Sequence, residues 1–304
     1  MRAIITGGTG LIGSQLAASL AKDGYEVIVL SRNPGQHQGD IHESVQAVRW
    51  DAHSADGWGH LADGADIIVN LAGANLSGGR WTEARKRVLR QSRLDAGHAI
   101  VEAVEQAAQK PKVLIQPSGV NYYGMHGDET LTEQDPPGDD FLARLTIDWE
   151  ASTAPVEQMG VRRVVTRSGV VLSLEGGAFP KMALPFHLFA GGPVGSGKQW
   201  LSWIHIADEV AAMRFLIDNP QTFGVYNLTA PNPVTNRQFG ETLGRVLHKP
   251  SVMPVPAFVM QAIFGEMSSV LLEGQRVLPE RLEQAGFQFK FPTLESALQN
   301  LYHE

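Results

Sequence analysis

The chain has 304 residues and a mass of 33.0 kDa, enough for one large hydrophobic core or two unequal ones. Its 32 acidic residues outnumber 25 basic ones, so the formal charge of -7 argues against a nucleic acid partner, and the absence of cysteine excludes disulfides, thiolate metal sites and cysteine nucleophiles. The sequence has no signal-peptide core, no apolar stretch near the ~20 residues that span a bilayer, and no histidine or carboxylate cluster with metal-ligand spacing, so we expect a cytoplasmic protein without a membrane or metal partner.

The first third of the sequence alternates short apolar runs with segments of helical spacing, a pattern typical of βαβ units and a parallel sheet. The apolar run Arg2–Thr6 predicts a strand, and Leu16 with Leu20 predicts a helix that Gly24 ends. Further apolar runs predict strands at 27–30, 45–50, 66–71 and 112–115. Continuously apolar strands suit a sheet with both faces covered.

Longer segments complete the predicted fold. Few helix breakers interrupt 82–109, which predicts one long helix, and 141–159 and 163–172 predict a further helix and strand. These elements favour an α/β fold with a Rossmann-type, doubly wound parallel sheet. We expect an NADP-binding domain over 1–175, with a return segment near 203–230.

Glycines and prolines become dense after Leu172. This change in composition predicts a substrate-side and C-terminal lobe over 176–304 that is smaller than the NADP-binding domain and mostly helical. Prolines at 250, 254, 256 and 292 separate three or more expected helices in it.

A glycine-rich turn follows the first strand directly and leads into the first helix. Its residues are Gly7, Gly8, Thr9, Gly10, Leu11, Ile12 and Gly13. Glycines allow a tight turn and a close approach of backbone N–H groups to a pyrophosphate, while the helix N-terminus supplies partial positive charge. The alternative is a glycine-rich turn that binds nothing, but its place after strand one favours a dinucleotide site.

The end of the second strand indicates which dinucleotide is bound. A carboxylate there, about 20 residues past the loop, binds the ribose 2′-hydroxyl of NAD. This chain has Ser31 and Arg32 instead, and Arg32 follows Gly13 by 19 positions (32 − 13). A guanidinium can bind a 2′-phosphate bidentately and a serine can donate to it, so we predict NADP(H) as the cofactor. The alternative is that Arg32 is a solvated loop cation.

Several motifs together resemble the extended short-chain dehydrogenase/reductases. They are the glycine loop, Ser31-Arg32, Asn70-Leu71-Ala72-Gly73, Ser92-Arg93, Tyr122-Tyr123-Gly124, Trp149-Glu150, the stretch 167–172, the glycine-rich 191–197, the stretch 203–208 and the C-terminal 271–281. The longer motifs resemble a subfamily known as epimerase family proteins or nucleoside-diphosphate-sugar epimerases, some with a cell-division-inhibitor label. The resemblance covers nearly the whole chain.

The resemblance implies a set of cofactor contacts. They are the glycine loop, Ser31, Arg32, Leu71 and Ala72 above the ribose, Arg93, and Val171 near the nicotinamide. From the predicted fold itself, the turn Leu71-Ala72-Gly73 follows a strand and so lies at the carboxyl edge of the sheet, where doubly wound folds bind ligands. A homodimer through a helix face is common for this fold, and the sequence leaves the oligomeric state open.

The catalytic pair of short-chain dehydrogenases is missing. These enzymes use a tyrosine with a lysine four residues later, yet no Tyr-x-x-x-Lys occurs in this chain. An alignment on Glu150 puts Phe141-Leu142 and Leu145-Thr146 in its place, and none of these side chains suits that acid/base role.

Three other side chains are candidates for catalysis. Ser118 follows the fifth strand at the usual serine or threonine position, where its hydroxyl can bond a carbonyl or alcohol. Tyr122 and Tyr123 follow it and are the candidate proton donors. The alternative for the two tyrosines is that one packs in the core and the other covers the pocket wall.

The sequence is compatible with three functions. The leading hypothesis is an NADP(H)-dependent oxidoreductase or epimerase with altered acid/base residues, acting on an unidentified small molecule between the sheet edge and the C-terminal lobe. The second is a non-catalytic regulatory or interaction protein that senses NADP(H). The third is a scaffold with an empty nucleotide fold, which tight NADP binding would exclude.

Overall fold

A seven-stranded sheet forms the centre of the computed structural model, which describes residues 1–36 and 42–303. The strand order is β11-β7-β5-β4-β1-β2-β3, and all neighbours are parallel. The strands are β1 (Arg2–Thr6), β2 (Glu26–Ser31), β3 (Val45–Arg49), β4 (Ile67–Asn70), β5 (Val113–Gly119), β7 (Arg162–Ser168) and β11 (Gly224–Leu228). The order reverses at β1, which confirms the predicted Rossmann-type, doubly wound sheet.

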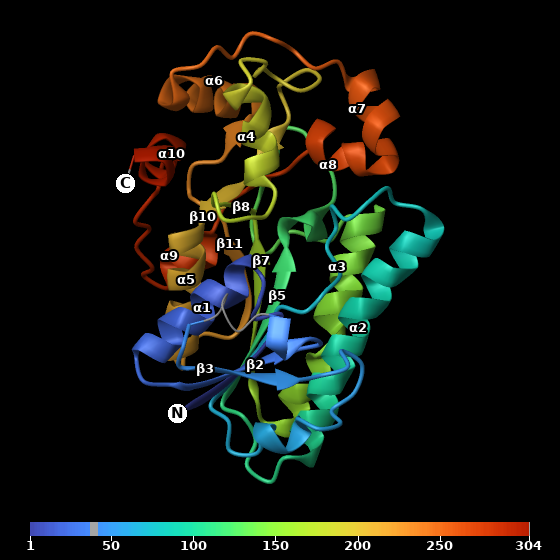
Figure 1. Cartoon of the computed structure of the whole chain (residues 1–304), viewed down its shortest axis with the longest axis vertical. Coiled ribbons are helices and arrows are strands. Elements are labelled where there is room, and N and C mark those ends of the chain that lie inside the picture. Colours follow the sequence, from blue (N-terminus) through green and yellow to red (C-terminus); the bar gives the residue numbers. More distant parts are fainter. Residues whose placement is uncertain (37–41, 304) are drawn as a thin grey trace.

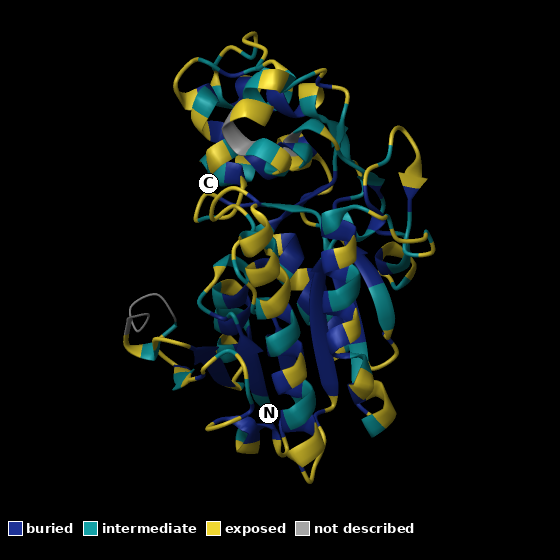
Figure 2. Cartoon of the chain, turned by 90° about the vertical axis from the view of Figure 1, so that its right-hand side faces the viewer, coloured by how far each residue is buried: buried dark blue, intermediate teal, exposed yellow. Residues whose placement is uncertain are grey.

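Helices cover both faces of the sheet (Figure 1). They are α1 (Leu11–Lys22) and α5 (Ile206–Asp218) on one face, and α2 (Glu83–Gln106) and α3 (Phe141–Ser152) on the other. Neighbouring strand residues point to opposite faces, so Ile5 packs with Leu16 and Met213 whereas Ile4 packs with Ile100. Figure 2 shows the buried strands between the half-exposed helices.

Polar side chains define where several helices begin. The hydroxyl of Thr82 accepts the N–H of Arg85 at the start of α2, and Asp140 caps α3 in the same way. At the start of α6 (Asn236–Leu247), Thr235 and Gln238 form a reciprocal capping box. Each cap satisfies N–H groups that the helix itself leaves unpaired.

Two predicted elements are divided in the structure. The strand predicted at 163–172 is two strands, because the backbone changes its partner: the pairing with β5 and β11 ends at Ser168, and the N–H of Val170 donates to the carbonyl oxygen of Ser202 at 2.8 Å. Glycine is needed at 169, where a Cβ would lie 2.6 Å from that oxygen. The second piece, β8 (Val170–Leu172), leaves the main sheet and pairs with β10 (Trp203–His205). The helix predicted at 141–159 ends at Ser152, and the 3-10 helix Ala154–Met159 follows, because Pro155 cannot continue the α-helical hydrogen bonding.

A helical lobe lies beyond the carboxyl ends of the sheet strands (Figure 1). After Thr235 the described residues form α6, α7 (Ala257–Phe264), α8 (Ser269–Leu272), α9 (Glu280–Gln284) and α10 (Leu294–His303), while α4 (Phe179–His187) precedes them. Of these helices, α9 lies beside β11 rather than in the lobe, and its Leu282 belongs to the core of the sheet. Phe179, Phe239 and Leu298 join α4, α6 and α10 in one apolar cluster. The short strands are β6 (Thr130–Leu131), β9 (Trp200–Leu201), β12 (Val234–Thr235) and β13 (Arg276–Val277). Among the described residues, no helix is long and apolar enough to cross a membrane.

Candidate functional site

The glycine loop joins β1 to α1 with little room for side chains. Gly7 has a φ of +66°, and a Cβ there would lie 2.7 Å from the carbonyl atoms of Leu71. A Cβ on Gly13 would lie 2.5 Å from the carbonyl oxygen of Gly7. Glycine at both positions therefore lets the loop pack against itself and against the turn after β4.

The N-terminus of α1 has no side-chain partner. Its N-cap residue is Gly10, no side chain caps the helix, and the first turn holds no acidic residue. The free N–H groups and the helix dipole thus leave partial positive charge next to the loop. Thr6 supports this edge, because its hydroxyl accepts the N–H of Ala72 at 3.1 Å.

Ser31 and Arg32 lie beside this loop. Thr6 is paired with Leu30 in the parallel register of β1 and β2, which places Ser31 next to Gly7. The Ser31 hydroxyl is buried and accepts the N–H of Asn33 at 3.2 Å. The Arg32 side chain is exposed and makes no hydrogen bond or ion pair to the residues that the structure describes. It is accordingly available to a ligand.

Arg93 is a buried cation under the turn after β4. Its Nη1 donates to the carbonyl oxygens of Ala74 (3.2 Å) and Leu89 (3.0 Å), and its Cζ lies 4.8 Å from the ring centre of Trp149. A Cβ on Gly73 would lie 3.0 Å from that Cζ. Burial lowers the pKa of Arg93 to about 10, and no carboxylate in the described part of the chain pairs with it.

The residues near the other end of the expected cofactor site also come together. Val171 lies in β8, and the turn at Gly177 approaches both its carbonyl oxygen and the Leu11 side chain, since a Cβ on Gly177 would lie 4.0 Å and 3.1 Å from them. The structure thus places the glycine loop, Leu71 to Gly73, Arg93 and Val171 around one edge of the sheet.

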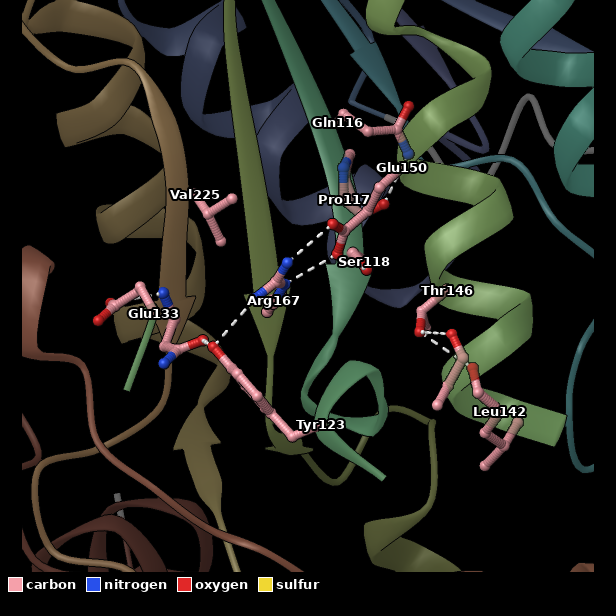
Figure 3. Close-up of polar contacts among 12 residues, drawn as sticks. Gln116, Pro117, Ser118, Tyr123, Glu133, Leu142, Thr146, Glu150, Arg167 and Val225 are labelled. Atoms are coloured by element: carbon pink, nitrogen blue, oxygen red, sulfur yellow. Dashed lines mark hydrogen bonds and ion pairs between the residues drawn. The ribbon is translucent and has the colours of Figure 1, made fainter. Parts of the chain in front are cut away.

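Ser118 belongs to a buried polar network (Figure 3). Its hydroxyl donates to Glu150 Oε1 at 2.7 Å. The guanidinium of Arg167 binds the same carboxylate bidentately, with Nε to Oε1 and Nη2 to Oε2 both at 2.9 Å. The side chains of Arg167 and Glu150 are 4% and 11% exposed, so the pair lies inside the protein. Burial by itself lowers the pKa of Arg167, but its hydrogen bonds to Glu150 and the charge of that carboxylate outweigh burial and raise the pKa above its ordinary value.

The two tyrosines differ in their surroundings. Tyr123 is fully buried; its hydroxyl donates to Asn227 Oδ1 at 2.7 Å and accepts from Arg167 Nη1 at 3.2 Å. Burial raises the pKa of Tyr123 to about 12. Tyr122 is only half-buried, and the Cζ of Arg167 lies 3.2 Å from the centre of its ring. Of the two tyrosines, Tyr122 is therefore the one that keeps some exposed surface.

On the face of α3 where a Tyr-x-x-x-Lys pair would lie, the side chains are apolar or form hydrogen bonds to the backbone of the same helix. Leu142 packs with Trp81 and Leu145, and the hydroxyl of Thr146 donates to the carbonyl oxygens of Leu142 (3.0 Å) and Ala143 (2.8 Å) (Figure 3). No group on this face exchanges a proton readily.

A cavity of about 40 Å³ lies between this face and the helical lobe. Its lining residues come from the segment after β5, the start of α3 and the lobe: Asn121, Met125, Asp140, Leu142, Ser269, Val270, Glu273, Gly274 and Gln275. Asn121 follows Ser118 by three positions in the sequence, but Ser118, Tyr122 and Tyr123 are not among the lining residues.

Sequence reasoning assigned no role to several buried polar residues. Glu150 and Arg167 were part of the resemblance only, and Glu209 was not singled out. Glu209 is fully buried on α5, accepts from the Ser168 hydroxyl at 2.6 Å, and its pKa is raised to about 8 by burial. A signal existed for Arg167, because a cation in a strand predicted to lie inside a doubly wound sheet needs a buried partner.

The parallel sheet with a glycine loop where its order reverses defines a Rossmann-type fold of the dinucleotide-binding class. A model of the NAD dependent epimerase/dehydratase family matches residues 3–229, and the chain belongs to this family. A second model, a domain of unknown function (DUF1731), matches residues 255–301 in the helical lobe. The resemblance drawn from the sequence motifs is confirmed.

Individual proteins are similar over the whole chain. Epimerase family protein YfhF of Bacillus subtilis is 40% identical over 302 residues, covering 99% of this chain and 98% of the relative. The crystal structure of human epimerase family protein SDR39U1 (isoform 2) with NADPH is 38% identical, with a TM-score of 0.89 over 99% of each chain. A nucleoside-diphosphate sugar epimerase from Corynebacterium glutamicum is 33% identical, with a TM-score of 0.78 over 98% of this chain and 57% of that one.

Proposed function

We propose that this protein binds NADP(H) and is an oxidoreductase or epimerase that acts on a small molecule without a Tyr-x-x-x-Lys pair. The observation that carries the proposal is the uncapped start of α1 behind the glycine loop, with Arg32 rather than a carboxylate at the end of β2. The first feature favours a pyrophosphate and the second a 2′-phosphate. The NADPH in the similar human structure supports this choice of cofactor.

Arg93 and Val171 complete the proposed cofactor site. A buried guanidinium without a carboxylate partner is costly, and an anionic group of the cofactor beside Gly73 would compensate it. Ser31 stands next to the proposed 2′-phosphate. The half-buried Val171, beside Leu11, provides an apolar surface for the nicotinamide ring.

Bound NADP(H) would supply or accept a hydride, and the chain would move the accompanying proton. The proton of Ser118 is engaged by Glu150, so the Ser118 oxygen is left to accept a hydrogen bond from a substrate hydroxyl. Arg167 holds Glu150 in place and lies against the ring of Tyr122. We assign the proton transfer to Tyr122, and we give Tyr123 a positioning role because its hydroxyl is buried and bonded on both sides.

Calorimetric titration with NADPH, NADH, NADP and NAD tests the cofactor assignment. The expected result is at least about tenfold tighter binding of NADP(H), with Arg32→Ala losing about 1.4 kcal/mol or more of that preference. Arg87→Ala removes an exposed arginine on α2 and serves as the control, which keeps the preference. Failure of every dinucleotide to bind would contradict the proposal.

The second candidate function is an NADP(H)-sensing protein without catalysis. Two observations favour it: the Ser118 hydroxyl already donates its proton to Glu150, and the Tyr-x-x-x-Lys pair is missing. NADPH consumption separates the two functions. Tight NADPH binding combined with no oxidation by any aldehyde, ketone, quinone or nucleotide sugar would support the sensor and oppose the enzyme.

A further inference from the structure

Two arginines of α2 lie against the loop that joins β4 to α2, residues 71–82. Arg85 Nη2 donates to the carbonyl oxygen of Asn75, and Arg93 Nη1 donates to that of Ala74 at 3.2 Å. Burial lowers the pKa of Arg93 to about 10, and the nearby positive charge of Arg85 lowers it as well. The two guanidinium groups are therefore close together, and they repel each other unless an anion offsets their charge.

A third cation reaches the same loop from the lobe. Lys181 is the third residue of α4, and its Nζ donates to the Ser77 hydroxyl at 3.0 Å. Lys181 follows Gly177 by four positions (181 − 177), and Gly177 lies beside Leu11 and Val171, the surface proposed for the nicotinamide. One short segment of the lobe thus connects the loop 71–82 with the nicotinamide end of the proposed cofactor site.

No acid in the described part of the chain pairs with any of these three cations. The loop 71–82 and the segment 176–189 contain no aspartate or glutamate. Glu83, which follows the loop, and Glu266 of the lobe are both engaged by Lys86, at 3.3 Å and 2.6 Å. The positive charge around the loop is therefore not balanced by the protein itself.

The three cations also keep N–H donors that have no acceptor. The ammonium of Lys181 has three N–H groups and donates to one hydroxyl. Arg85 Nε is buried without a hydrogen-bond partner, and its Nη1 makes no hydrogen bond to the residues that the structure describes. In Arg93, Nη1 alone is bonded within the described residues. Because a buried donor without an acceptor costs free energy, a ligand with several charged oxygens would stabilise this arrangement.

We propose that Lys181 and Arg85 form an anion site on the loop 71–82, and that the substrate carries a carboxylate or phosphate group that binds there. Arg93, beside Gly73, serves the anionic group of the cofactor, which leaves Lys181 and Arg85 for the substrate. Carboxylates and phosphates offer two or three charged oxygens that suit a guanidinium and an ammonium together. This inference rests on the proposed function and names the substrate class of the same site.

Calorimetry on the NADP-loaded protein tests the site with two probes, inorganic phosphate and acetate, which distinguish the two kinds of anion. The titrations are made at low salt, because screening weakens exposed charge pairs. We expect at least one probe to bind in the millimolar range, and Lys181→Gln and Arg85→Gln each to weaken its binding by about tenfold or more. Lys198→Gln is the control and should leave binding unchanged, since this exposed ammonium makes no contact with the described residues.

NADPH oxidation then tests whether the site selects the substrate. Two pairs of aldehydes differ in one anionic group: butanal with succinic semialdehyde, and glyceraldehyde with glyceraldehyde 3-phosphate. In at least one pair, kcat/KM should be about tenfold or more higher for the anionic member, and Lys181→Gln should remove this preference through a higher KM. Because Lys181 is exposed, its replacement should not disturb folding, so the test stands even if Arg85→Gln is destabilised.

The outcomes separate this inference from the proposed function. The inference is overturned if neither probe binds, if Lys181→Gln binds the probes as the wild type does, or if both aldehyde pairs are used equally. If NADP itself does not bind, the proposed function fails, and the same titrations of the free protein still decide whether the anion site exists. Probe binding through Lys181 without oxidation of NADPH by any aldehyde would support the anion site and oppose the enzyme.

Discussion

Replacing Arg167 by methionine tests whether the buried network is held by its central ion pair. The change removes a bidentate partner of Glu150, whose side chain is only 11% exposed, and leaves that carboxylate without a cation. Breaking one side of a buried pair costs about 3–5 kcal/mol. For a chain of this size, ~2 °C per kcal/mol converts this to a fall in Tm of roughly 6–10 °C.

The assay is urea unfolding followed by circular dichroism, with Tm as a second reading. The control is Arg245→Met, which breaks an equally short pair with Glu295 whose side chains are 60% and 47% exposed. Exposed pairs contribute less than about 1 kcal/mol, so this variant should unfold close to the wild type. The double variant Glu150→Leu with Arg167→Met should recover most of the loss, because no unpaired charge remains.

The reasoning about the network is refuted if Arg167→Met and Arg245→Met lose similar amounts of stability. It is equally refuted if the double variant is less stable than Arg167→Met alone. Either result would mean that the Glu150 carboxylate finds another partner or water when Arg167 is removed.

Two further predictions concern a buried acid and the tyrosines. Burial raises the pKa of Glu209 from 4.5 to about 8. Between these pH values the folded protein keeps a proton on Glu209 that the unfolded chain has lost. The contribution of Glu209 to stability is therefore fully present below pH 4.5 and is lost as the pH rises to 8. Glu209→Gln should therefore gain about 1.4 kcal/mol per pH unit relative to wild type between pH 5 and 8 in urea unfolding, and a difference independent of pH would contradict the assignment. Tyr122→Phe should lower kcat for NADPH oxidation by about a hundredfold or more, as expected for loss of a general acid. Tyr123→Phe should keep kcat within a few-fold while losing about 1 kcal/mol of stability, and the reverse pattern would exchange the roles of the two tyrosines.

Local patterns were sufficient for most of the secondary structure. Arg2–Thr6 is the first strand as predicted, and the first helix ends where Gly24 adopts a φ of +81°. Apolar runs and glycine positions depend on residues close in sequence, so they can be read without the fold. The division of the strand at Gly169 depends on the backbone of Ser202, which is 33 positions away (202 − 169) and accepts the N–H of Val170. No pattern among neighbouring residues predicts that contact.

The sequence by itself determined the chemical inventory of this protein: a glycine loop between a strand and a helix, an arginine at the end of the second strand, and no Tyr-x-x-x-Lys pair. Only the tertiary structure decided how those groups are used. It engages the proton of Ser118 with Glu150, 32 residues further along the chain, and it buries Tyr123 completely while leaving Tyr122 half-buried. The physical reason is that burial and hydrogen-bond partners are set by contacts between distant segments, whereas spacing and residue type are properties of the chain alone.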